Sequence, residues 1–124
     1  FDFLGFTFYC GKGRKTGNFC VKLKTSRKKF SMKLKQTKEW LYQNNDLPVK
    51  ELIAKLNKKL VGHYRYYGVS HNMNKLNSFL HYVQRYLFKV LNRRSHKKSY
   101  LWNGYIDMLK VYPLAQPKIY VRLF

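Results

Sequence analysis

The sequence predicts a mainly α-helical chain that begins with a small β-hairpin. Residues 1–25 alternate apolar and polar side chains around a glycine-rich stretch, which is typical of two strands joined by a loop. From residue 27 onward, apolar residues recur every three or four positions, which indicates helices that share one core. We therefore expect an N-terminal antiparallel hairpin, a three-helix bundle, a short fourth helix and an extended tail.

The hairpin is expected to pair residues 1–9 with residues 19–25 across a loop over 11–18. Its second strand places Phe19, Val21 and Leu23 on one face and Lys22 and Lys24 on the other, so one face is basic. Two strands alone are marginally stable. We therefore expect the hairpin to belong to a larger sheet that lies mostly outside this chain.

The first helix is expected over residues 27–43, where Phe30, Leu34 and Leu41 fall on one side. The Asn44-Asn45 pair is expected to end it, because these side chains compete with the helical backbone for hydrogen bonds.

The second helix is expected over residues 48–67, with Asp46 as its N-cap. Gly62 lies inside this helix at a cost of ~1 kcal/mol relative to Ala, which predicts a close backbone approach there. Gly68 is expected to end the helix. The apolar stripe of this helix consists of Leu52, Ile53, Leu56, Leu60, Tyr64 and Tyr67.

The third helix is expected over residues 72–94 and the fourth over about 100–110, with Ser99 as the cap of the fourth. Pro113 and Pro117 exclude further helix, and residues 119–124 suit a final strand. The apolar face of the third helix consists of Leu76, Phe79, Leu80, Val83, Leu87, Val90 and Leu91.

The charge is the strongest functional signal, because 26 Lys and Arg face five acids and give a net charge of +21. So large a charge on a short chain favours a polyanionic partner, nucleic acid first and an anionic membrane surface second. Aromatic residues make up 18% of the chain, enough for a core and for rings that stack on bases. No apolar run approaches the ~20 residues that span a bilayer, and no signal peptide is visible, so the cytoplasm is the default.

The residue pattern does not indicate an enzymatic function. No two carboxylates have the spacing of an acid–base pair or a two-metal site. Cys10 and Cys20 suggest a reduced structural pair, with a cross-strand disulfide or a metal contact as the alternative. We expect no catalytic residue, metal or cofactor in this chain. The scattered carboxylates are Asp2, Glu39, Asp46, Glu51 and Asp107.

Three groups of residues are candidates for nucleic-acid contact, although each could instead be a solvated or packed face. The first lies at the end of the hairpin and along the first helix: Lys22, Lys24, Arg27, Lys28, Lys29, Lys33, Lys35 and Lys38. The second follows the third helix: Arg85, Lys89, Arg93, Arg94, Lys97 and Lys98. In the third, His63, Arg65 and Tyr66 are expected on the outer side of the second helix, with Tyr64 and Tyr67 in the core.

Two segments resemble a known family. Phe3-Leu4-Gly5-Phe6 resembles the primer-grip hairpin that ends the reverse-transcriptase domain of group II intron-encoded proteins, and residues 47–67 resemble its maturase-specific signature. Val61 and His63 depart from this pattern, where the family usually has Arg and Trp. The matching positions are Leu47-Pro48, Leu56-Asn57, Leu60, Gly62, Tyr66 and Tyr67, followed by Arg93-Arg94, Trp102, Tyr112-Pro113-Leu114 and Pro117.

The resemblance implies that residues 1–25 close the palm as a primer grip built on Phe3, Leu4, Gly5 and Phe6. Residues 26–110 would form the thumb-like maturase domain, and 111–124 a tail. The expected partners are group II intron RNA, an RNA–DNA duplex and an upstream palm that carries the Tyr-x-Asp-Asp motif and its Mg²⁺, with no membrane. The expected location is the bacterial cytoplasm, or less favourably an organelle.

Two other classes of function remain open from the sequence. An unrelated basic RNA- or DNA-binding module, such as a ribosome-associated protein, would show equal affinity for intron RNA and random duplex. A membrane-surface protein would bind anionic vesicles but no RNA.

Overall fold

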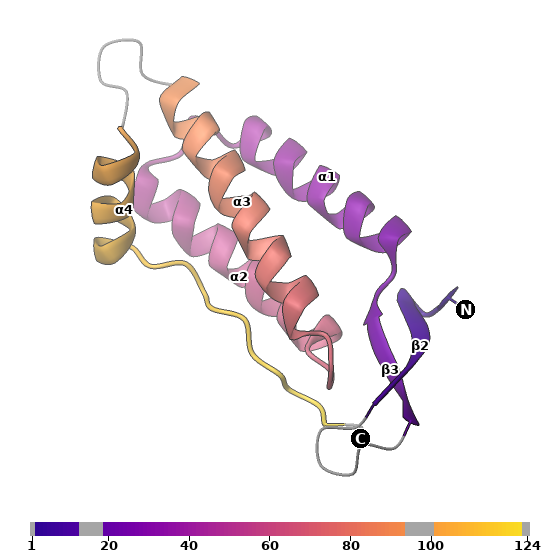
Figure 1. Cartoon of the computed structure of the whole chain (residues 1–124). Coiled ribbons are helices and arrows are strands. Elements are labelled where there is room, and N and C mark those ends of the chain that lie inside the picture. The colour runs from indigo at the N-terminus through magenta and orange to yellow at the C-terminus, as the bar shows by residue number, and fades with distance from the viewer. Residues whose placement is uncertain (1, 13–18, 94–100, 123–124) are drawn as a thin grey trace.

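A computed structural model describes residues 2–12, 19–93 and 101–122 of the chain. Strands β1 (Asp2–Phe3), β2 (Phe6–Lys12) and β3 (Phe19–Thr25) form an antiparallel sheet in the order β1-β2-β3. Helices α1 (Arg27–Gln43), α2 (Val49–Tyr67), α3 (Met73–Arg93) and α4 (Trp102–Val111) follow. The expected class, mainly helical with an N-terminal hairpin, is confirmed (Figure 1).

The expected single strand over residues 1–9 is wrong, because the backbone turns at Leu4 and Gly5. Both have positive φ, at 54° and 87°, and Phe3 pairs with Phe6 across them. Positive φ at both central residues gives a two-residue turn whose twist matches that of the flanking strands. The longer pairing of β2 with β3 runs from Phe6 opposite Thr25 to Lys12 opposite Phe19.

The residue that caps the N-terminus differs from helix to helix. Ser26 caps α1, because its hydroxyl accepts a hydrogen bond from the Lys29 N–H at 3.2 Å, and α1 has the expected bounds. Asp46 does not cap α2 and that expectation is wrong: Pro48 is the N-cap, and its carbonyl accepts from the Leu52 N–H at 2.8 Å. Ser99 lies outside the described residues, and Leu101 instead precedes α4 with no side-chain cap bond.

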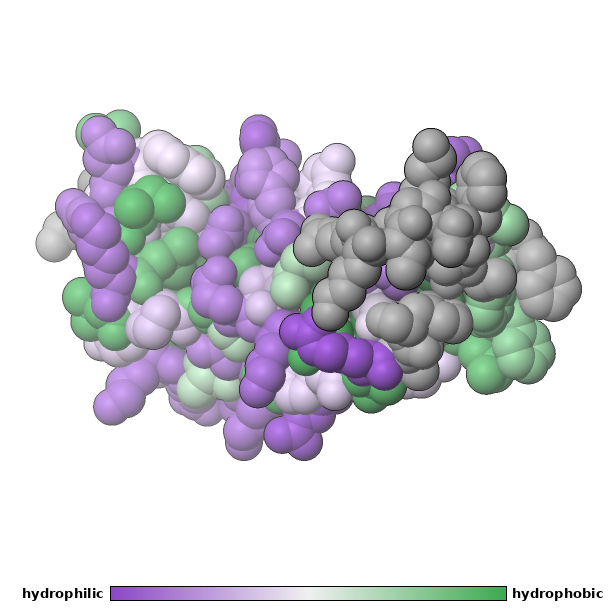
Figure 2. Space-filling model, turned by 60° about the horizontal axis from the view of Figure 1, so that its bottom comes forward, coloured by the Kyte–Doolittle hydropathy of each residue, from purple (hydrophilic) through white to green (hydrophobic). Residues whose placement is uncertain are grey.

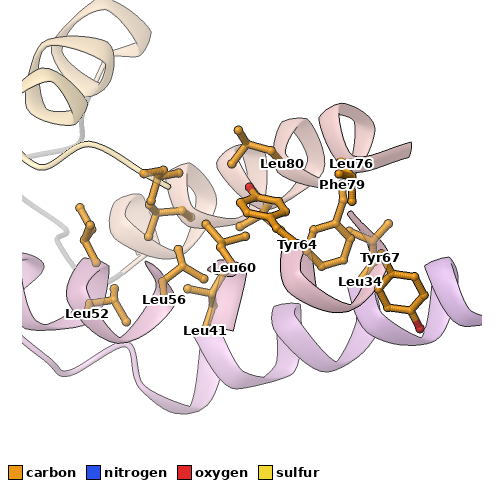
Figure 3. Packing of buried hydrophobic residues seen from close by; sticks show 14 of the residues in the cluster. Leu34, Leu41, Leu52, Leu56, Leu60, Tyr64, Tyr67, Leu76, Phe79 and Leu80 are labelled. Atoms are coloured by element: carbon orange, nitrogen blue, oxygen red, sulfur yellow. The ribbon is translucent and has the colours of Figure 1, made fainter. Parts of the chain in front are cut away.

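The core lies between α1, α2 and α3. Helices α1 and α3 run in the same direction and α2 runs against both (Figure 1). Leucine and tyrosine side chains from the three helices point toward one another in this core (Figure 3). The expected apolar stripes of α2 and α3 are all buried. Burying several large apolar side chains at ~25 cal/mol per Å² is the main stabilisation of such a bundle.

Helix α4 packs on α3 through aromatic contacts. The Tyr105 side chain is fully buried and its hydroxyl donates to the Gln84 carbonyl at 2.7 Å. The Phe88 ring centroid lies 5.1 Å from those of both Trp102 and Tyr105. Burial raises the pKa of Tyr105, because the apolar surroundings disfavour the charged phenolate.

The segment after α4 is extended and runs along α2 (Figure 1). The Asn57 amide donates to the Pro113 carbonyl at 3.0 Å and accepts from the Ala115 N–H at 2.8 Å. The Tyr64 hydroxyl donates to the Ala115 carbonyl at 2.9 Å. Residues 119–122 form no strand, contrary to expectation: Val121 makes one isolated parallel bridge to Val69.

The close backbone approach expected at Gly62 occurs instead at Gly68. A Cβ added at Gly62 would meet no atom of the described chain within 4 Å. A Cβ at Gly68 would overlap the carbonyl oxygens of Tyr64 and Lys118, because the extended tail crosses the end of α2 there. Gly68 is the C-cap of α2, as expected, and its carbonyl accepts hydrogen bonds from the tail.

Candidate nucleic-acid interface

The Leu4-Gly5 turn is fastened to the end of α2. The Tyr66 hydroxyl donates to the Leu4 carbonyl at 2.8 Å, and the Phe6 ring lies nearly parallel to the Tyr66 ring at 5.9 Å. A Cβ at Gly5 would lie 3.0 Å from the Tyr67 hydroxyl oxygen, and φ there is +87°, so this position favours glycine for two reasons. The two segments that carry the family resemblance therefore contact each other.

The four residues that the resemblance predicts as a primer grip have different environments. Leu4 is 67% exposed at the tip of the turn, and Phe3 beside it is exposed as well. Phe6 is buried among the core residues. Of these residues, Phe3 and Leu4 therefore present their side chains at the surface, whereas Phe6 packs against α2 and holds the turn in place.

Asn72, which sequence reasoning missed, joins the sheet to the helices. It is fully buried, and its Oδ1 accepts from the Thr25 N–H at 2.8 Å. Its Nδ2 donates to the Thr25 hydroxyl and to the Tyr67 carbonyl, each at 2.8 Å. A polar residue directly before a helix is a signal for a cap, but these long-range bonds give no signal in sequence.

The basic run along α1 divides between two sides of the helix. Lys29 and Lys33 lie one turn apart and line a cleft against α2. Lys28 and Lys35 are exposed, and the Lys38 ammonium lies over the Tyr86 ring of α3. A run that looks continuous in sequence thus serves two surfaces, since the helical period separates its members.

Cations and aromatic rings alternate where α1 meets α3, and we call this arrangement the α1–α3 seam. The pairs, with the distance from the cation to the ring centroid, are Lys75 with Phe30 (5.1 Å), Lys38 with Tyr86 (5.4 Å) and Arg93 with Tyr42 (5.1 Å). Tyr82 is exposed beside the Phe30 ring. The seam offers positive charge and ring surface together, which is the combination that binds nucleic-acid strands.

The other expected contact residues are placed as follows. Arg85 and Lys89 are exposed on α3, four residues apart and in line with Arg93. Lys24 is exposed over the Tyr9 ring at 5.2 Å, whereas Lys22 is half-buried. The remaining placements are Arg27 exposed, Arg65 exposed over the Tyr120 ring at 6.0 Å, and Arg94, Lys97 and Lys98 outside the described residues.

A cleft of about 690 Å³ lies between the Leu4-Gly5 turn, α1 and α2. Lys29 and Lys33 reach it from α1, and Lys59, a residue that sequence reasoning missed, reaches it from α2. The Tyr66 ring lines the same cleft and is 53% exposed. The ammonium groups give this concave surface a positive charge.

His63 also lines this cleft, but the expectation that it lies on the outer side of α2 is wrong. Its side chain is only 9% exposed, and its ring stacks on Phe79 at 3.8 Å with an interplanar angle of 10°. Neither ring nitrogen has a hydrogen-bond partner among the described residues. Burial, and then the positive charge of Lys33, lower the pKa of His63 to about 4. The ring is therefore neutral at pH 7.

Little negative charge offsets these cations. Lys55 pairs with Glu51 at 3.4 Å and Lys110 with Asp107 at 3.6 Å, both through side chains at least half exposed. Exposed pairs of this kind contribute roughly 0–1 kcal/mol. On the coloured part of the face shown in Figure 2, hydrophilic and hydrophobic residues are intermixed. The surface is suited to contact with a phosphate backbone and with bases.

The described part of the chain contains no candidate metal cluster and no helix that could span a membrane. No group of three or more His, Cys, Asp or Glu residues there could hold a metal ion. Cys10 is exposed and free. None of the described helices has the length and apolar character needed to cross a bilayer.

Comparison with known protein families gives a match over most of the helical region. The model of the group II intron maturase-specific domain matches residues 27–105, from the start of α1 into α4. Searches of curated proteins and of solved structures found no match. The matched region contains the seam and the α1 and α2 walls of the cleft.

Proposed function

The chain belongs to the family of the group II intron maturase-specific domain, and from this premise we propose that it holds intron RNA by its phosphate backbone. Binding, and not catalysis, would be the contribution of this chain to splicing. The net charge of +21 supports the proposal, because a compact chain with so few acids is stabilised by a polyanion.

The α1–α3 seam is the observation that carries this proposal. Its three cations lie over rings, and the ion pairs among the described residues involve Lys55 and Lys110 and none of these three. A cation over a ring keeps its charge available for phosphate, since the ring does not neutralise it. Contacts of this type position RNA by its backbone and leave base recognition to other residues.

The Leu4-Gly5 turn supports a second part of the proposal, namely that the hairpin positions a primer end and the helices hold an RNA–DNA duplex. Exposed Phe3 and Leu4 stand next to the basic cleft, and hydrogen bonds from Tyr66 and from the Ser26 N–H hold the turn in place. A turn fixed at both carbonyls can orient a strand end reproducibly. An upstream palm domain would complete this site.

The seam is tested by the triple variant Lys38→Gln, Lys75→Gln and Arg93→Gln, measured on structured intron RNA over a range of salt. We expect the slope of log affinity against log salt to become shallower by about one unit per lost phosphate contact. The matched control removes the same charge from exposed basic residues elsewhere, through Lys50→Gln, Lys58→Gln and Arg122→Gln. Equal losses in both triple variants would show that net charge alone binds RNA and that the seam has no special part.

A further inference from the structure

We propose that the cleft beside the Leu4-Gly5 turn binds one unpaired nucleotide of the RNA, with its phosphate at the lysines and its base against Tyr66 and His63. The inference rests on the proposed function, because it assigns a particular RNA element to a protein that we propose binds RNA. It differs from backbone gripping, since an open ridge of cations binds paired RNA equally well.

The lysines make the cleft an anion site. Lys29 and Lys33 project from successive turns of α1, and Lys59 faces them from α2. The Lys59 ammonium lies over the Trp40 ring at 5.1 Å, which restricts its position without cancelling its charge. No carboxylate is among the described residues that line the cleft. Phosphate is the anion that an RNA-binding chain meets at this site.

His63 supplies the reason to expect a base as well as a phosphate. Its ring lines the cleft, is nine-tenths buried and leaves both nitrogens without a partner among the described residues. Buried polar groups in folded proteins nearly always have a hydrogen-bond partner, so the two nitrogens at the wall of the cleft are groups that a bound ligand or a water would satisfy. The edge of a nucleobase carries donors and acceptors that complement a neutral imidazole.

Tyr66 supplies a ring for stacking. Its hydroxyl is bonded to the Leu4 carbonyl at 2.8 Å and its ring packs on Phe6, so its orientation is fixed while half of its surface stays exposed. An aromatic ring presented in this way stacks on a base without selecting its identity.

The size and concave shape of the cleft suit an unpaired nucleotide better than a base pair. Its volume of about 690 Å³ is within the range of small-molecule sites, roughly 300–1,000 Å³. A base that stays paired is held inside its duplex and cannot enter a concave site, whereas a bulged or extruded base can. RNA with such a base at the right distance from the backbone contacts should therefore bind more tightly.

The test compares two hairpin RNAs of the same sequence, one fully paired and one with a single bulged adenosine. We expect the bulged RNA to bind the wild-type chain about tenfold more tightly, which stacking of one base can supply. A third hairpin with an abasic bulge separates base from phosphate, and it should lose most of this preference. Equal affinity for paired and bulged RNA, or for the abasic and adenosine bulges, would overturn the inference.

The variant Gly62→Trp assigns the preference to the cleft. Gly62 lines the cleft, and a Cβ there meets no described atom within 4 Å, so a large side chain can occupy the space that the nucleotide needs. We expect this variant to lose the preference for the bulge, so that bulged and paired RNA bind it with equal affinity. Gly104→Trp is the matched control, because Gly104 is also open at its Cβ but lies on α4, and it should retain the preference.

The remaining outcomes are also decisive. If Gly62→Trp loses its helical circular dichroism, Lys33→Glu takes its place, and an undiminished preference in that variant would contradict the inference. If paired RNA binds but the bulge adds nothing, the inference fails while the proposed function stands. If neither RNA binds at low salt, the proposed function itself fails.

Discussion

Asn72 shows how much one side chain can contribute to this fold. It links β3 to the end of α2 through three hydrogen bonds of 2.8 Å in a fully buried position. Removing the amide leaves the Thr25 N–H and the Tyr67 carbonyl without this partner inside the protein. A buried group left in that state costs about 1–3 kcal/mol.

We therefore expect Asn72→Ala to lower the free energy of unfolding by about 3 kcal/mol, measured by urea denaturation. Asn74→Ala is the control, because Asn74 is an exposed asparagine two residues further along the chain. A loss of the same size in both variants would contradict the role given to Asn72.

His63 makes stability depend on pH. An unfolded histidine takes up a proton near pH 6.5, whereas His63 in the folded chain has a pKa of about 4. Between these values the unfolded state holds more protons, so the free energy of unfolding falls as the pH drops. We expect this contribution to be complete above about pH 6.5 and to decline by about 3 kcal/mol by pH 4. Chemical denaturation at a series of pH values measures it.

The variant His63→Phe is the control for this pH effect. A phenyl ring keeps the stack on Phe79 and removes the two unpartnered nitrogens, so the variant should be more stable at pH 7 and should unfold with a flatter pH dependence. If the pH profile stays as steep in this variant, another group causes the effect.

The burial of His63 could have been predicted from the spacing of residues in the sequence. It lies three residues after Leu60 and four before Tyr67, so the helical period places it within the buried stripe. Because histidine is polar, it is not counted when the apolar stripe of the helix is traced. The cations that pair with rings across the seam could not be found in this way, because each pair joins residues more than 40 positions apart in the chain.

At the scale of the elements, two glycines of α2 can be compared: Gly62 inside the helix and Gly68 at its end, where the tail crosses it. The backbone at Gly68 has φ −78°, which other residues also adopt, so a side chain is excluded by close contacts, chiefly with the Tyr64 and Lys118 carbonyls. Gly62 lies in the same helix with open space around it.

We expect Gly68→Ala to destabilise the chain by about 2 kcal/mol or more, by displacing the tail or the end of α2. Gly62→Ala should stabilise it by about 1 kcal/mol through helix propensity. Thermal unfolding compares the two variants directly, and a shift in the same direction for both would contradict the docking of the tail on Gly68.

Helices α1 to α3 were predictable and the sheet was less so. The helical period placed the ends of these helices within one or two residues. The turn at Leu4-Gly5 gave a weaker signal in the sequence, because leucine rarely adopts a positive φ. Leu4 is held in this conformation by a hydrogen bond from the Tyr66 hydroxyl, 62 positions away in the chain. The tail likewise depends on Asn57 and Tyr64, which are distant from it in the chain.

At the scale of the whole molecule, the composition indicated an anionic partner but not its location. A net charge of +21 favours a polyanion. Folding then decides which cations act together: α1 and α3 run side by side in the same direction, so the seam brings cations and rings from both helices onto one surface. The cleft forms on another side of α1, where the turn and α2 meet it.

The central claim is that this charge holds the backbone of structured RNA, and affinity as a function of salt tests it most directly. The wild-type chain would be titrated with group II intron RNA and with an unrelated structured RNA of equal length, from about 50 to about 200 mM salt. We expect affinity for both to fall steeply with salt, and the intron RNA to bind more tightly at each concentration. Failure to bind either RNA at the lowest salt, or an affinity that does not change with salt, would contradict the account.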